Sequence, residues 1–257
     1  MTHAPPRPVN VAVVGVANRS HFLFSRLEQL CEQMKVTAVC DLYPSRLKLA
    51  VERYALEGVA VYSDALECIA DADCDAVMVF TPDGTHADVV IPALEAGKHV
   101  FVEKPLDITE PRCRAIIAAD RAAGGRTYVG FNLRHAPVYS RVKKVVDAGG
   151  AGRILTIQAD EFYDGGRTYF RRWNRLRAKS GGLWITKACH DFDILQWIAG
   201  APAESVSAYS ALTYYRPRED AARYCGDCRL RETCPDAYKV QPAYLSREMF
   251  DFTMAAV

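Results

Sequence analysis

Residues 9–20, VNVAVVGVANRS, decide the fold of this chain. The first six are rich in valine, Gly15 ends them, and residues 19–34 then carry apolar side chains at helical spacing. The stretch therefore predicts a buried strand, a tight turn and a helix. Backbone amides in such a turn can hold a pyrophosphate, although only the first glycine of the G-x-G-x-x-G pattern is present.

The alternation of strands and helices continues through the first half of the chain. Further elements are predicted as strands at residues 36–40, 76–80, 100–102 and 126–131, and as helices at 86–96 and 109–123. Thr85 and Asp88 are expected to cap the first of these helices. Helices of this length between strands imply right-handed crossovers, so residues 1–132 are expected to form an α/β domain with a doubly wound parallel sheet.

The second half has a different pattern, and residues 133–257 are expected to form a separate α+β domain. Strands are predicted at residues 154–162 and 206–214, and a helix at 183–199. A polar, arginine-rich loop precedes the helix. Long loops of this kind are often functional.

The composition is that of an ordinary globular protein, with 257 residues, 50% of them hydrophobic, and a formal net charge of +1. No overall charge favours nucleic acid or an anionic membrane, and no stretch is long and apolar enough to span a bilayer. A cytoplasmic location is expected because the N-terminal residues lack the apolar segment of a secretion signal. The nine cysteines are expected to be reduced and mostly buried.

Asp41 follows the second predicted strand, 26 positions after Gly15. A carboxylate there accepts both hydroxyls of an adenine ribose and repels a 2′-phosphate, which favours NAD over NADP. The competing interpretations are a turn aspartate at Asp41 and a surface histidine at His86. The predicted cofactor-binding residues are Gly15, Ala17, Asn18, Arg19, Asp41, Thr81, Pro82, Thr85, His86, Glu103 and Lys104.

Glu103-Lys104-Pro105 directly follows the fourth predicted strand. Pro105 disfavours helical geometry at Lys104, so the ammonium is aimed at the edge of the sheet where ligands bind. The alternative interpretation of Lys104 is a solvated strand end.

A second set of reactive side chains lies on the helix after Gly181-Gly182. Thr186, His190 and Asp193 are spaced to share one face of that helix, with Lys187 close to His190. The alternative interpretation of His190 is a hydrogen-bonded core histidine.

Cys225, Cys228 and Cys234 form a compact thiol motif. The first pair has the spacing of a zinc knuckle, and thiolates also ligate iron–sulfur clusters. No later cysteine or histidine supplies a fourth ligand. No metal is therefore predicted, and metal binding stays open against a reduced structural loop.

The turn at Gly15, Thr81-Pro82, Glu103-Lys104-Pro105 and the helix with His190-Asp191-Phe192-Asp193 together resemble the Gfo/Idh/MocA family of glucose-fructose oxidoreductases, inositol dehydrogenases and rhizopine-catabolism proteins. The resemblance covers nearly the whole chain. It implies an NAD(P)-binding Rossmann domain and a C-terminal domain with a large, mainly antiparallel open sheet, through which copies could associate. It also implies reversible oxidation of a hydroxyl on a sugar, cyclitol or related polyol.

The chain departs from the family pattern in two ways. Family members usually carry an aspartate four residues before the catalytic histidine, where this chain has Thr186 followed by Lys187, as in a variant branch with a second lysine in the site. Either Asp193 or Lys187 is expected to take over the tuning of the histidine, or turnover is expected to be altered. Family members are also generally longer, so the second domain is expected to be a fragment or a naturally short form.

The resemblance assigns the reaction to His190 as general base and to Lys104 as hydrogen-bond donor to the same oxygen, while a hydride passes to the nicotinamide. The catalytic residues so implied are Lys104, His190 and Lys187, and the substrate contacts are Asn132, Arg134, Arg171, Trp173, Lys187 and His190. The cationic set favours an acidic or phosphorylated sugar. The alternatives are an NAD-using glycosidase of the same fold and a non-catalytic sugar sensor that binds NAD.

Overall fold

The computed structural model describes residues 7–163, 169–170, 173–216, 218–222 and 224–237. The chain divides into two compact units, which meet in sequence between Gly130 and Phe131. Within the described ranges, no helix is both long and apolar enough to cross a membrane.

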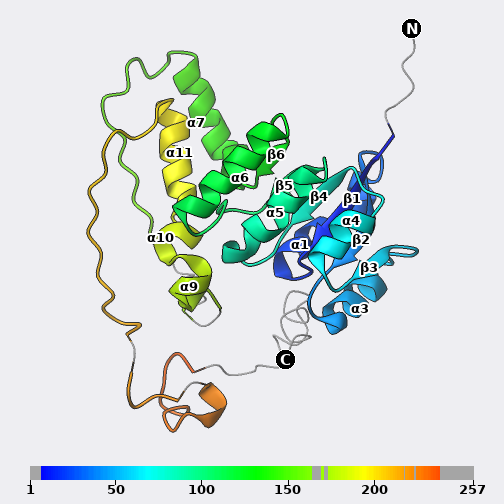
Figure 1. Cartoon of the computed structure of the whole chain (residues 1–257). Helices are drawn as coiled ribbons and strands as arrows, with labels where there is room; N and C mark the ends of the chain where they lie inside the picture. The colour runs from blue at the N-terminus through cyan, green and yellow to red at the C-terminus, as the bar shows by residue number, and fades with distance from the viewer. Residues whose placement is uncertain (1–6, 164–168, 171–172, 217, 223, 238–257) are drawn as a thin grey trace. The chain divides into compact units, whose positions relative to one another are not determined.

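The first unit is built on a six-stranded parallel sheet in the order β3-β2-β1-β4-β5-β6 (Figure 1). The strands are β1 Val9–Val14, β2 Met34–Cys40, β3 Ala60–Tyr62, β4 Ala76–Val79, β5 His99–Val102 and β6 Thr127–Val129. The strand order reverses between β1 and β4, which makes the carboxyl ends of these two strands the place where such sheets bind ligands. The doubly wound parallel sheet expected from the sequence is confirmed.

Helices cover both faces of this sheet. They are α1 Asn18–Phe24, α2 Leu27–Leu30, α3 Pro44–Arg53, α4 Ala65–Asp71, η1 Asp83–Thr85, α5 His86–Glu95 and α6 Glu110–Ala122. Successive residues of β1 point to opposite faces: Ala12 and Val14 pack in one core with α4, α5 and α6, whereas Val11 and Val13 pack in another with α1 and α3. Because both faces are buried, β1 is continuously apolar from Val11 to Val14 rather than alternating.

In its described residues, the second unit combines short helices with long irregular stretches. Its elements are η2 Asn132–His135, α7 Pro137–Asp147, η3 Trp173–Arg175, α9 Arg177–Ser180, α10 Leu183–Thr186, α11 Cys189–Ala199 and η4 Cys225–Asp227. The strands expected at 154–162 and 206–214 are not formed in this structure. Strands need ladder partners and a buried face, yet Leu155 and Tyr209 are 83% and 95% exposed.

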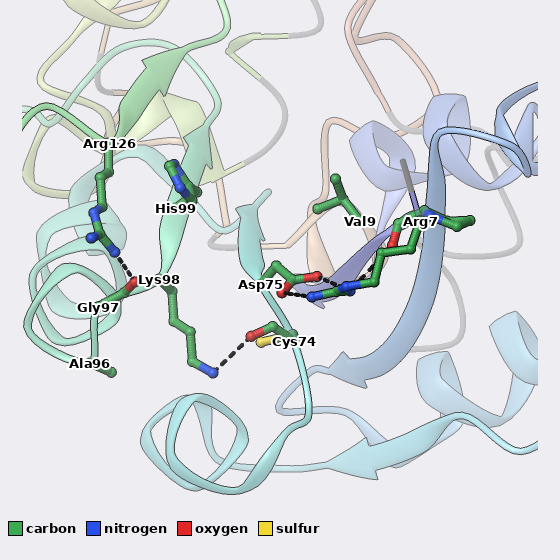
Figure 2. A pocket seen from close by; sticks show the side chains of 10 residues that line it. Arg7, Val9, Cys74, Asp75, Ala96, Gly97, Lys98, His99 and Arg126 are labelled. Carbon is green, nitrogen blue, oxygen red and sulfur yellow. Dashed lines mark hydrogen bonds and ion pairs between the residues drawn. The ribbon is translucent and has the colours of Figure 1, made fainter. Parts of the chain in front are cut away.

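A cavity of about 550 Å³ lies at the amino ends of the strands, the edge opposite the ligand-binding edge. Figure 2 shows that its charged side chains are bonded to the protein itself. Arg7 pairs with Asp75, while Lys98 donates to the carbonyl of Cys74 at 2.8 Å. These contacts hold the starts of the strands together. None of the predicted site residues lines the cavity.

Asp75 is expected to make the stability of the first unit depend on acid pH. The bidentate Arg7 guanidinium, at 2.6 and 2.8 Å, and the amide of Asn10 lower the pKa of Asp75 to about 2. A folded-state pKa below the unfolded one adds stability that is complete above the unfolded pKa and is lost as the pH falls toward the folded one. The Tm difference between wild type and Asp75→Asn should therefore be full at pH 6 and shrink between about pH 4 and about pH 2.

Salt should also reduce that difference, because the Arg7 side chain is 69% exposed. Glu110→Gln, in an exposed pair with Arg114 on α6, serves as the control. A Tm difference for Asp75→Asn that grows toward low pH would contradict the assignment.

Candidate active site

The turn after β1 passes directly against the end of β4. Gly15 has φ of +95°, and a Cβ there would lie 2.7 Å from the carbonyl carbon of Phe80 and 2.8 Å from the amide nitrogen of Thr81. Only glycine permits this approach. The amide of Gly15 donates to the carbonyl of Cys40 at 2.8 Å, that of Val16 to the carboxylate of Asp41 at 2.8 Å, and that of Ala17 to the Ser20 hydroxyl at 2.9 Å. Three successive amides of the turn are therefore bonded within the protein, rather than left for a pyrophosphate as the sequence suggested.

Asp41 is buried at the end of β2 and joins this strand to the turn. Its carboxylate accepts from the amide of Val16 at 2.8 Å and from the amide of Tyr43 at 2.9 Å. Burial raises the pKa of Asp41 despite these bonds and the guanidinium of Arg46 at 3.6 Å. Asp41 therefore acts as a turn aspartate, which was the alternative to ribose binding. It also lies at the end of β2, where a ribose-binding carboxylate is expected.

Arg46 was missed by sequence reasoning. It lies on α3, and its guanidinium carbon is 4.5 Å from the centre of the Tyr43 ring. The only available signal was its place one turn into the helix after Asp41, and spacing alone did not separate it from other surface arginines.

His86 joins the loops that carry Thr81 and Lys104. The ring is fully buried, with Nδ1 2.8 Å from the carbonyl oxygen of Pro105 and Nε2 3.0 Å from that of Thr81. His86 is therefore not a surface histidine, and the geometry gives it a positioning role. The side chain of Thr85 does not cap α5 as expected, because its hydroxyl donates to the carbonyl of Pro82 and Asp88 pairs with Arg112 instead.

The Glu103-Lys104-Pro105 loop contacts the turn after β1. The Glu103 carboxylate pairs with the Arg19 guanidinium at 3.0 Å and accepts from the amide of Lys104 at 3.3 Å. Lys104 is partly exposed, and the peptide bond to Pro105 is cis. The structure thus brings Gly15, Arg19, Thr81 and Glu103 together at the carboxyl edge of one sheet.

In the second unit, the helix expected at 183–199 is broken at Lys187 and Ala188 into α10 and α11. The single face predicted for Thr186 and His190 therefore does not exist as one continuous helix. Thr186 is 2% exposed, and its hydroxyl accepts from the amide group of Asn174 at 3.3 Å. His190 is 9% exposed in the first turn of α11, with its ring edge-on to Phe131.

The predicted substrate contacts have different surroundings. Arg134 is bound by both carboxylate oxygens of Asp193, at 2.5 and 2.8 Å, and lies over the ring of Trp197. Asn132 is exposed at the start of η2, and Trp173 begins η3. Arg171 lies outside the described residues.

Lys187 pairs with Glu161, a residue that sequence reasoning did not select. The two charges are 2.5 Å apart, and the Lys187 ammonium also lies 4.7 Å from the centre of the Tyr163 ring. Glu161 belongs to a stretch expected to be a strand, where a carboxylate gave no signal of its own.

The cysteine motif forms a short turn at η4. The amide of Cys228 donates to the carbonyl of Cys225 at 3.3 Å, and Cys225, Cys228 and Cys234 are half-buried and not joined to one another by disulfides. Across the described ranges, no group of three or more metal-binding side chains is brought together, at these cysteines or elsewhere.

Comparisons with known proteins match both halves of the chain. The model of the oxidoreductase family with an NAD-binding Rossmann fold covers residues 9–131, and the model of the C-terminal α/β domain of the same family covers residues 143–251. A putative oxidoreductase of Bacillus subtilis, YteT, is 31% identical over 88% of this chain and 56% of its own length. The chain thus spans little more than half of that relative.

Two further proteins are similar. The scyllo-inositol 2-dehydrogenase (NAD(+)) of Bacillus subtilis is 30% identical over 93% of this chain and 72% of its own length. A crystal structure of the WlbA dehydrogenase from Bordetella pertussis in complex with NADH and UDP-GlcNAcA matches with a TM-score of 0.74 and 28% identity, over 82% of this chain and 65% of that one. The chain belongs to the Gfo/Idh/MocA oxidoreductase family.

Proposed function

We propose that this protein is an NAD-dependent oxidoreductase that moves a hydride between the nicotinamide and a hydroxyl or carbonyl group of a sugar, cyclitol or sugar derivative. The observation that carries the proposal is the convergence at the carboxyl edge of the sheet: the Arg19–Glu103 pair and the Asp41–Val16 bond bring three strand ends to one turn. Family membership supports the same class of reaction.

The residues at this edge fit a dinucleotide. Gly15 lets the turn after β1 pack directly against the backbone of Phe80 and Thr81, which places both loops at the carboxyl edge where a dinucleotide binds. Asp41 uses two acceptor positions on backbone amides and has further lone pairs for ribose hydroxyls, since a carboxylate accepts about four bonds. A buried carboxylate also opposes a 2′-phosphate, which supports NAD over NADP.

The side chains of the chain supply the proton chemistry. His190 accepts the proton of the substrate hydroxyl, and the Lys104 ammonium donates a hydrogen bond to the oxygen from which that proton leaves. Bound NAD supplies the hydride acceptor. Asn132, Trp173 and Lys187 are proposed to contact the substrate, whereas Arg134 is proposed to hold α11 through Asp193.

A sugar sensor that binds NAD without turnover is the second candidate. Thr186 favours it, because a buried threonine bonded to Asn174 stands where the family usually has an aspartate. The dehydrogenase forms NADH with a free polyol, whereas the sensor binds NAD and forms none. An NAD-using glycosidase would form no net NADH and would cleave a glycoside.

The proposal is tested by following nicotinamide absorbance with a panel of sugars, inositols and uronic acids. At least one compound is expected to reduce NAD, with kcat/KM at least about tenfold higher than with NADP. Asp41→Ser should reduce the difference in kcat/KM between NAD and NADP, because it removes the charge that repels the 2′-phosphate. Tight NAD binding without turnover across the panel would favour the sensor.

A further inference from the structure

We propose that Glu161 is a positioning residue that holds the Lys187 ammonium at the start of α11, and that it supplies the carboxylate that Thr186 lacks. The inference rests on the proposed function for the role of Lys187 at the substrate, but not for the contact itself. It assigns a carboxylate from a distant stretch of chain to the histidine helix.

The contact between the two side chains is direct and joins a largely buried lysine stem to a carboxylate that is 41% exposed. Glu161 Oε1 lies 2.5 Å from Lys187 Nζ across 26 residues of sequence. The Lys187 side chain is 14% exposed, and the Tyr163 ring covers its ammonium. Since an ammonium loses hydration in such a place, a charged partner is needed to keep it protonated and aimed.

Asp191 adds a second carboxyl group to the pair. Burial and then the neighbouring Glu161 charge raise the pKa of Asp191, whereas the hydrogen bond from Lys187 lowers that of Glu161. The opposite directions of the two shifts make Glu161 the carboxyl group that carries negative charge more readily. Glu161 is therefore the counter-ion of Lys187, and Asp191 adds a smaller charge contribution.

The charge on Lys187 follows from this arrangement. Burial lowers the pKa of Lys187, but the hydrogen bond and charge of Glu161, with smaller contributions from Asp191 and Tyr163, reverse the effect and raise it. His190, three residues along the chain, also lies in the field of Glu161. Lys187 thus remains a cation beside the proposed base.

The other expected source of tuning is committed elsewhere. Asp193 binds Arg134 through both oxygens, so it is engaged away from Lys187. The sequence left Asp193 and Lys187 open as the residue that tunes His190. Of the two, Lys187 is the one whose partner, Glu161, also interacts with His190 through its charge.

The test is NMR titration of lysine side chains labelled at the ε-carbon, in the protein without substrate, with Lys187→Arg to assign the signal. Glu161→Gln is expected to lower the pKa of Lys187 by about one unit, because the direct counter-ion is lost while the smaller charge contribution of Asp191 remains. Glu161→Gln with Asp191→Asn is expected to lower it by about two units or more. Asp191→Asn alone should lower it less than Glu161→Gln does.

The matched control is Asp160→Asn, the adjacent exposed carboxylate, which accepts from Gln158 rather than from Lys187. It should leave the Lys187 titration unchanged. An equal titration in wild type, Glu161→Gln and Asp160→Asn would overturn the proposal. If Glu161→Gln fails to fold, Glu161→Asp is measured instead. The shorter carboxylate keeps its charge but lies farther from Lys187, so the increase that it gives to the pKa of Lys187 should fall by about half or more.

Turnover gives a second, separate readout. With a substrate from the panel, Glu161→Gln should move the alkaline limb of the kcat pH profile to lower pH, a change that lost packing alone would not produce. A shifted lysine titration without any turnover in wild type would keep the positioning role and reject the dehydrogenase. Turnover in wild type with an unshifted lysine titration in Glu161→Gln would keep the dehydrogenase and reject the positioning role of Glu161.

Discussion

Lys104→Met is expected to lower kcat by about 100- to 1000-fold, with a much smaller change in NAD affinity. Methionine keeps the length and apolar stem of lysine but removes the charge that stabilises a developing alkoxide. Lys104 is partly exposed at the end of β5, so the substitution should cost little stability. The measurement is steady-state kinetics on the substrate found in the panel, beside NAD binding by fluorescence quenching.

Lys98→Met is the matched control because Lys98 stands at the other end of the same strand. Its ammonium donates to the carbonyl of Cys74 on the amino edge of the sheet. It should lose some thermal stability and keep its kcat. Normal turnover in Lys104→Met, with NAD still bound, would remove Lys104 from the proposed reaction.

Gly15→Ala is expected to reduce the free energy of unfolding of the first unit by about 3 kcal/mol, through both overpacking and backbone strain. The new Cβ would lie 2.7 and 2.8 Å from backbone atoms of Phe80 and Thr81, which cannot rotate away as a side chain could. The φ of +95° is strained for any L side chain. Urea unfolding followed by circular dichroism measures the loss, and NAD affinity should fall with it.

Gly58→Ala separates strain from the close approach. Gly58 has φ of +71°, but a Cβ there meets nothing within 4 Å. It should cost only about 1 kcal/mol, the price of a left-handed conformation alone. Equal losses at Gly15 and Gly58 would show that the contact with β4 is unimportant.

Most strands of the first unit followed from the sequence, but the helix expected over residues 19–34 is divided into α1 and α2, and Met34 already belongs to β2. The strand predicted at residues 9–14 is β1, and the helices predicted at 86–96 and 109–123 are α5 and α6 with their ends shifted by one residue. Buried strands and amphipathic helices are marked by the spacing of their apolar residues. The short strand β3 was missed, because three residues show no periodicity and are placed only by their pairing with β2.

The second unit followed less well. Its two expected strands are absent from the part of the chain that the structure describes, and its long helix is interrupted. Strand propensity acts through neighbours, so a strand-like stretch without a partner stays irregular. The break at Lys187 places that residue on a non-helical link, where the distant Glu161 reaches it.

The sequence by itself determined the doubly wound sheet, the family, and the placement of Gly15 and Asp41 at strand ends, because apolar periodicity and strand-end motifs are local patterns. The roles of Lys104 and His190 stay predictions. Only the tertiary structure decided which charges are paired. Arg134 is bound to Asp193 across 59 residues, Arg19 to Glu103 across 84, and Lys187 to Glu161 across 26. Ion pairs depend on distances of a few ångströms between side chains from separate elements, and residue spacing along the chain does not encode those distances.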